Sequence, residues 1–213
     1  IEVSDDALIL TPETSHGWDE ERMSFFELCE RSVPAAHEYM RKLSRERGEE
    51  VKPTLSIGWL IFLATRVPFL TATIVPVLLG AVIARFHGFS NWWLAMLALL
   101  GGSLIHLALN VTNDVADATS GADEANVNPT MFSGGSRMIQ YGLVSLRTMR
   151  NAAIGLYLAG IAIGLYLAAT RGWDLLWIGV VGIFLSIFYS APPFKLVHRG
   201  LGEVCVAAGF GPI

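Results

Sequence analysis

The chain has 213 residues, of which 53% are hydrophobic and only 16% are charged, and its mean hydropathy is +0.49. Soluble globular domains carry about 25% charged residues, so this composition argues against a soluble domain and indicates a membrane protein. The formal net charge is −4, and we expect no nucleic acid among the partners of the chain.

Residues 1–56 are polar and hold 7 Lys/Arg and 13 Asp/Glu. Between Glu20 and Arg47 apolar residues recur among charged ones, which predicts one or two helices that break or start at Pro34. The first 20 residues have neither the basic start nor the apolar core of a signal peptide. A membrane-surface helix or the end of an upstream domain would fit this segment. A solvated, partly helical extension on the cytoplasmic side is the simpler interpretation.

Four apolar runs follow, and each is long enough to cross a bilayer when its flanks are included. They cover residues 67–84, 92–109, 152–169 and 175–191. Tryptophans lie near the ends of these runs, as aromatic residues do at a membrane interface. Gly160 and Gly164 form a small-xxx-small pair suited to close helix packing. The pattern predicts an all-α fold, a polytopic membrane helix bundle, for residues 57–213.

A fifth apolar run begins at Gly200 and stops at Ile213, and its 14 residues are too few to span a bilayer. The chain also starts with Ile1 instead of a methionine. We therefore expect a fragment that contains about four complete spans and the start of a fifth.

The basic residues are divided unevenly between the two sides that these runs would separate. One side holds residues 1–56, the loop 110–151 and the loop 192–199, with 12 Lys/Arg in all, whereas the other side holds Arg85 and Arg171. Basic loops mark the cytoplasmic side of a membrane protein. We therefore predict a multi-pass protein of the cell (cytoplasmic) membrane, in contact with the lipid bilayer, whose long polar loops are cytoplasmic.

An acidic cluster lies at the end of the second run. Asn110, Asp114 and Asp117 are spaced i, i+4 and i+7, so they share one face if the segment is helical. Two carboxylates on one face repel each other unless a cation lies between them, and oxygen ligands that share substrate phosphates suit Mg²⁺. A capped, solvated helix end is the simpler alternative, but charges next to a membrane span are costly and usually functional. We therefore predict Mg²⁺ as cofactor, with Asp123 in the following loop as a further candidate ligand.

Two later segments place cations on the same predicted side as the acidic cluster. Residues 132–137 contain two glycines, whose backbone N–H groups can approach an anion, followed by Arg137. The guanidinium of Arg137 suits a phosphate group, although an ordinary flexible loop would also explain this segment. Pro192 and Pro193 stiffen the exit from the fourth run. They are followed by Lys195 and Arg199, which topology alone would also explain.

Three stretches together resemble the UbiA superfamily of intramembrane aromatic prenyltransferases. They are residues 110–123, 133–137 and 189–203. The pattern Asn-Asp-x-x-Asp-x-x-x-Gly-x-Asp, with Arg-Gly-Leu-Gly-Glu after the fourth run, is most similar to the 1,4-dihydroxy-2-naphthoate branch of menaquinone synthesis. Thr65-Arg66-Val67-Pro68 also resembles the start of the first helix in this family, although Arg66 would equally fit a snorkelling interface residue.

The resemblance implies eight or nine membrane helices in two four-helix halves, of which residues 57–213 would form the first half. A second Asp-rich motif that the family carries after its sixth helix is absent here, which fits a truncated chain. The implied reaction transfers a polyprenyl group from polyprenyl diphosphate to an aromatic acceptor with the help of Mg²⁺. The implied catalytic residues are Asp114, Asp117 and Lys195, and the implied diphosphate-binding residues are Asn110, Arg137, Lys195, Arg199, Tyr189 and Arg66.

Three alternatives remain open from the sequence. Relatives with this fold also prenylate 4-hydroxybenzoate, homogentisate, haem or glycerol lipids, so the acceptor is not fixed. CDP-alcohol phosphotransferases also use Asp-rich Mg²⁺ sites at a membrane face, but their Asp-Gly-x-x-Ala-Arg signature is absent. An ion-coupled transporter would need polar residues at the middle of its spans, whereas the acidic cluster lies at a span end.

Overall fold

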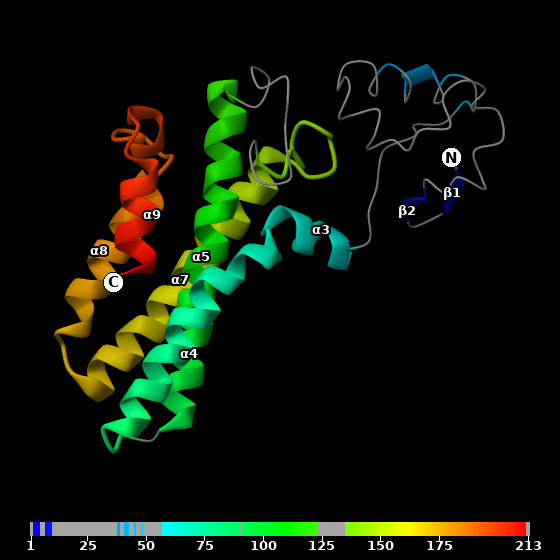
Figure 1. Ribbon diagram of the computed structural model, residues 1–213. Helices are drawn as coiled ribbons and strands as arrows, with labels where there is room; N and C mark the ends of the chain where they lie inside the picture. The colour runs from blue at the N-terminus through cyan, green and yellow to red at the C-terminus, as the bar shows by residue number, and fades with distance from the viewer. Residues whose placement is uncertain are drawn as a thin grey trace.

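The computed structural model describes residues 2–4, 7–9, 38, 41, 42, 45, 48, 57–89, 91–122 and 135–211. Near the N-terminus, β1 (Glu2–Ser4) and β2 (Ala7–Ile9) form a short antiparallel hairpin, which the sequence did not predict. Most of the segment between Glu20 and Arg47, with its predicted helices, lies outside the described residues. All other secondary-structure elements of the described chain are helices, so the predicted all-α membrane bundle is confirmed for the part that carries the acidic cluster (Figure 1).

The long helices run up and down beside one another, whereas the first helix of the series points away to one side (Figure 1). In chain order they are α3 (Ile57–Ala64), the 3-10 helix η1 (Val67–Leu70), α4 (Thr71–Phe86), α5 (Trp92–Ser120), α7 (Leu146–Arg171), α8 (Leu175–Phe188), the 3-10 helix η2 (Leu196–Arg199) and α9 (Gly202–Phe210). Within the described part of the chain, three segments are long and apolar enough to cross a membrane: η1 with α4, α5, and α7.

The fourth predicted run is shorter as a helix than as an apolar stretch. The helix α8 has 14 residues, about 21 Å at 1.5 Å per residue, which is less than a bilayer core of roughly 30 Å. It ends at Phe188 because the chain turns there into the segment with the two adjacent prolines. The fifth run forms α9, with 9 residues, and is short as expected.

The helix α5 is longer than the apolar run that predicted it. It has 29 residues, about 43 Å in length, so it exceeds the thickness of a bilayer core. At its start the side chain of Asn91 accepts a hydrogen bond from the backbone N–H of Leu94, at 3.2 Å. At its end Gly121 adopts a left-handed conformation with φ 76°. The acidic cluster therefore lies inside a regular helix that continues beyond the apolar run.

Close packing between α5 and α7 depends on a glycine from each helix. A Cβ atom added to Gly160 would lie 2.7 Å from Cδ1 of Ile105, and one added to Gly101 would lie 3.0 Å from Cγ2 of Ile163. At Gly164 an added Cβ would meet no described atom within 4 Å. The prediction that Gly160 packs closely is therefore correct, but its partner is Gly101 on the facing helix and Gly164 does not take part.

A valine at Gly160 should destabilise the bundle because the added side chain overlaps Ile105. Overpacking of this kind costs about 1–3 kcal/mol of the free energy of unfolding. Thermal unfolding of the full-length protein in detergent would measure the loss, with Gly164→Val as a control that adds the same side chain to the same helix in open space. Equal unfolding temperatures for the two variants would contradict this assignment of the contact.

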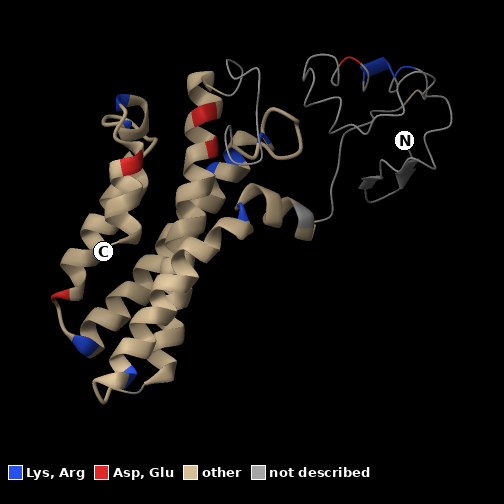
Figure 2. Cartoon of the chain, in the orientation of Figure 1, with Lys and Arg blue, Asp and Glu red and all other residues tan. Residues whose placement is uncertain are grey.

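Charged residues gather at one end of the bundle (Figure 2). This polar end contains the C-terminal part of α5, whereas Arg85, Arg171 and Asp174 lie at the opposite end (Figure 2). Between the ends the outer surface is apolar, and Val75 and Val180 are 63% and 57% exposed. An apolar belt between two polar ends is the surface of a polytopic membrane helix bundle.

Candidate active site

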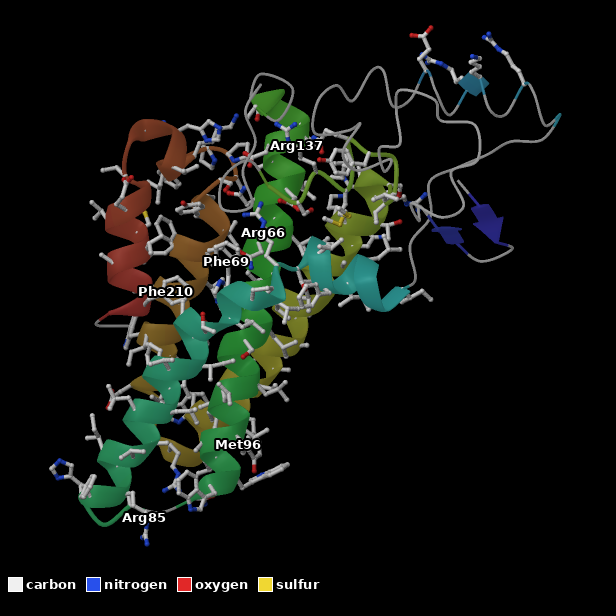
Figure 3. All side chains as sticks on the ribbon, turned by 45° about the vertical axis from the view of Figure 1, so that its right-hand side comes forward. Arg66, Phe69, Arg85, Met96, Arg137 and Phe210 are labelled. Atoms are coloured by element: carbon white, nitrogen blue, oxygen red, sulfur yellow. The ribbon has the colours of Figure 1, made fainter. Side chains whose placement is uncertain are left out.

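The first cation of the polar end is positioned by a turn between α3 and η1. Arg66 lies in this turn with a left-handed backbone, φ 52°, and Pro68 follows in the first turn of η1, where a missing N–H costs nothing. The side chain of Arg66 points toward α5 (Figure 3), and its guanidinium forms an ion pair and hydrogen bond with Asp114. A turn before the first long helix therefore supplies the counter-charge for the acidic cluster.

Asp114 is the buried centre of this cluster, and its side chain is 3% exposed. The backbone N–H of Ser136 donates to both of its carboxylate oxygens, at 3.1 and 3.2 Å, and the hydroxyl of Ser136 donates to Oδ2. The segment before α7 therefore folds against the end of α5. Arg137 follows directly, with a left-handed backbone at φ 54° and a buried side chain, and it lies above Arg66 at the same end of the bundle (Figure 3).

Asp117 lies one turn further along α5 and is only half-buried. The amide nitrogen of Asn113 donates to its Oδ2 at 2.5 Å. The oxygen of the same amide accepts a hydrogen bond from the hydroxyl of Ser190 at 2.7 Å. Among the described residues no hydrogen bond reaches Oδ1 of Asp117, so this oxygen keeps its capacity to bind a cation.

Asn110 occupies the deepest position of the cluster and is 6% exposed. Its amide nitrogen donates to the backbone carbonyl of Thr65 at 2.9 Å, which ties α5 to the residue before Arg66. The described residues give the amide oxygen no donor, so it is the atom that could face a cation. Because α5 is helical throughout, Asn110, Asp114 and Asp117 share a face as their spacing predicts.

The residues after α8 complete the polar end. Tyr189 is half-buried, and a Cβ atom on Gly202 would lie 3.4 Å from its hydroxyl. The backbone carbonyl of Tyr189 accepts a hydrogen bond from the N–H of Val197 at 2.9 Å, so the segment after α8 folds back on the end of this helix.

The two cations expected from the sequence after α8 differ in position. Lys195 is half-buried just before η2, with φ 45°, whereas Arg199 at the end of η2 is exposed. The described ranges give neither residue an ion pair with Asp114 or Asp117. Asp123, the fourth expected metal ligand, lies outside the described residues.

Sequence reasoning missed three uncharged residues that bind the carboxylates directly or through one partner. They are Ser136, Asn113 and Ser190. Each lies inside a motif singled out above, but other residues of these motifs were selected there as ligands, namely Asn110, Tyr189 and the charged residues. A small polar residue beside a charged one, at the edge of an apolar run, is the signal that would have found them.

The oxygens of the cluster fit Mg²⁺ in kind. Within the ranges that the structure describes, no group of three or more His, Cys, Asp and Glu side chains could hold a metal ion. Mg²⁺ needs only one or two protein carboxylates when substrate phosphates and waters provide its other ligands. Asp117 and Asn110 each keep an oxygen without a described donor, whereas Asp114 is already bound by Arg66 and Ser136. Asp117 is therefore the better candidate ligand.

Comparison with known proteins identifies the family of the chain. The pattern of the UbiA prenyltransferase family matches residues 73–213. The chain belongs to the UbiA prenyltransferase family. The resemblance seen in the motifs is thereby confirmed, and this UbiA family member is a multi-pass membrane protein.

Three curated relatives of this UbiA family chain illustrate the similarity. It is 29% identical to 1,4-dihydroxy-2-naphthoate octaprenyltransferase of Bacillus subtilis (strain 168), over 80% of this chain and 55% of the relative. It is 29% identical to 2-carboxy-1,4-naphthoquinone phytyltransferase of Synechocystis, over 70% and 47%. It is 28% identical to UbiA prenyltransferase domain-containing protein 1 of Dictyostelium discoideum, over 81% and 52%. The chain thus spans about half the length of these relatives, and no solved structure matches it.

Proposed function

We propose that the protein to which this chain belongs transfers a polyprenyl group from polyprenyl diphosphate to 1,4-dihydroxy-2-naphthoate, in a Mg²⁺-dependent step of menaquinone biosynthesis. The observation that carries the proposal is the convergence of two carboxylates from α5 with Arg66 at the polar end of a membrane bundle. A polyprenyl diphosphate has a charged head and an apolar tail, so it needs a polar site next to an apolar membrane region. Two of the three relatives named above carry a naphthoate or naphthoquinone in their names, which supports this acceptor.

The residues at the polar end would have different roles in the reaction. Asp117 and Asn110, with Asp114, would hold Mg²⁺, which when bound supplies positive charge to the diphosphate. Arg137 and Lys195 would bind the diphosphate oxygens directly, and Arg66, Arg199 and Tyr189 are further candidates for this contact.

The chemistry then follows from charge and from the apolar surroundings. The allylic C–O bond breaks with its electron pair leaving on the diphosphate, which the fixed cations stabilise. The apolar helices exclude water from the cationic allylic carbon. A carbon of the electron-rich ring forms the new C–C bond and then loses its carboxylate as CO₂.

We also propose that the polar end faces the cytoplasm, in the cell membrane. Arg66 and Arg137 lie at this end, whereas Arg85 lies at the other (Figure 3), where α7 also ends with Arg171. This distribution supports the orientation that the positive-inside rule predicts.

The function is tested with the full-length protein in lipid nanodiscs, supplied with a labelled polyprenyl diphosphate and 1,4-dihydroxy-2-naphthoate. We expect prenylated product that disappears with EDTA and returns with added Mg²⁺. Parallel reactions with 4-hydroxybenzoate, homogentisate, haem and a glycerol lipid would reveal another acceptor. Cation flux into liposomes with no prenylation of any acceptor would overturn the proposal in favour of a transporter.

A further inference from the structure

A chain of hydrogen bonds joins the end of α8 to the outer carboxylate of the acidic cluster. Ser190, the second residue after α8, donates to the amide oxygen of Asn113 at 2.7 Å, across a sequence separation of 77 residues. The amide nitrogen of Asn113 donates in turn to Oδ2 of Asp117 at 2.5 Å. Ser190 is 1% exposed, so no solvent competes for its single proton.

This chain fixes the orientation of the amide between its two ends. An amide has one acceptor oxygen and one donor nitrogen. With its oxygen held by the hydroxyl of Ser190, the nitrogen of Asn113 faces the carboxylate. Without Ser190 the amide oxygen would lose its donor, and the side-chain amide of Asn113 could rotate toward other partners. Oδ2 of Asp117 would then lose the hydrogen bond that holds the carboxylate in place.

We propose that Ser190 is a positioning residue that acts through Asn113 to hold Asp117 ready for Mg²⁺. In this arrangement Oδ2 is occupied by the amide and Oδ1 remains for the cation. The same bonds connect the carboxylate to the segment that carries Lys195, only five residues beyond Ser190. These hydrogen bonds therefore fix the position of the proposed cation site relative to the segment that carries Lys195. This inference rests on the proposed function, because it assigns a role within that same site.

The test compares Ser190→Ala with Ser186→Ala in the full-length protein. Ser186 is a suitable control because it is a buried serine on α8, one turn before Ser190. Its side chain is 5% exposed and shares a 2.7 Å hydrogen bond with Tyr157 on α7. Each variant loses one buried hydroxyl, from α8 or from the turn that follows it, but only Ser190 is hydrogen-bonded through Asn113 to Asp117. We expect Ser190→Ala to raise the Mg²⁺ concentration for half-maximal activity about three- to tenfold, and Ser186→Ala to leave it unchanged.

A double-mutant cycle asks whether Ser190 acts through Asn113. In an Asn113→Ala background, Ser190→Ala should have no further effect on the Mg²⁺ requirement, because the intermediate link is already gone. Equal Mg²⁺ requirements for Ser190→Ala and Ser186→Ala, or full effects of Ser190→Ala in the Asn113→Ala background, would overturn the inference.

A binding measurement separates this inference from the proposed function. Mn²⁺ bound with inorganic diphosphate is followed by electron paramagnetic resonance, without any turnover. Ser190→Ala should weaken Mn²⁺ binding by a similar three- to tenfold factor, whereas Ser186→Ala should not. An inactive wild-type protein in which these two variants still differ in Mn²⁺ binding would refute prenyl transfer and support the positioning role. Identical Mn²⁺ binding by both variants of an active enzyme would refute the positioning role alone.

Discussion

Replacing Asp117 with asparagine should lower kcat for prenyl transfer by about 10²- to 10³-fold, the loss typical when one group that stabilises transition-state charge is removed. The carboxylate oxygen that the structure leaves without a described donor becomes part of a neutral amide, which binds Mg²⁺ weakly. Asp117 is half-buried and its described contact is with Asn113, so the fold should be retained. Steady-state kinetics across a Mg²⁺ titration, together with a thermal unfolding curve, would measure both effects.

The matched control for this variant is Asp174→Asn. Asp174 is exposed at the opposite end of the bundle, next to α8, and we expect it to leave both kcat and the Mg²⁺ requirement unchanged. If Asp117→Asn kept more than a third of the wild-type kcat at every Mg²⁺ concentration, Asp117 would not be a metal ligand.

A second large effect is expected at Asp114, and it concerns stability first. Asp114→Asn removes the negative charge that pairs with Arg66 and accepts hydrogen bonds from Ser136. Removing one partner of a buried ion pair costs about 3–5 kcal/mol, and we expect the lower end because the Arg66 side chain is 21% exposed. The unfolding temperature of the full-length protein in detergent should therefore fall markedly, whereas that of Asp117→Asn should not.

The ion pair itself is tested by adding Arg66→Gln to Asp114→Asn. The double variant should be less destabilised than the sum of the two single variants, because each single change leaves the other charge unpaired. Purely additive losses would show that Arg66 and Asp114 do not stabilise each other. Activity should stay low in the double variant, since both charges belong to the proposed site.

The acidic cluster was the part of the site that sequence alone predicted best. The spacing of Asn110, Asp114 and Asp117 is a local property, and helical periodicity decides which side chains share a face. The partner of Asp114 was not predictable in this way. Arg66 lies 48 residues earlier in the chain, and its approach depends on the left-handed turn that only the packed structure reveals.

The limits of the helices were predicted less well than the positions of the apolar runs that form them, for a physical reason. An apolar run in the sequence indicates which residues contact lipid. A helix, in contrast, ends where a capping residue or a proline stops it. The helix α5 therefore continues past Leu109 to the glycine cap after Ser120, while α8 ends before the predicted limit at residue 191. Ser190 and Asn113 escaped notice because the hydrogen bond between them joins segments that are 77 residues apart in the sequence.

The length of α5 has a consequence for where the proposed reaction can occur. A helix of 29 residues is about 13 Å longer than a bilayer core is thick, and the acidic cluster occupies its final turns. An ionic head group can therefore meet its ligands at the water-facing boundary while its hydrocarbon tail stays dissolved in lipid. Neither substrate has to be lifted out of the membrane, and no ion has to enter the hydrocarbon. The turns of α5 beyond the apolar run therefore determine where, relative to the bilayer, the charged head group and the apolar tail meet the protein.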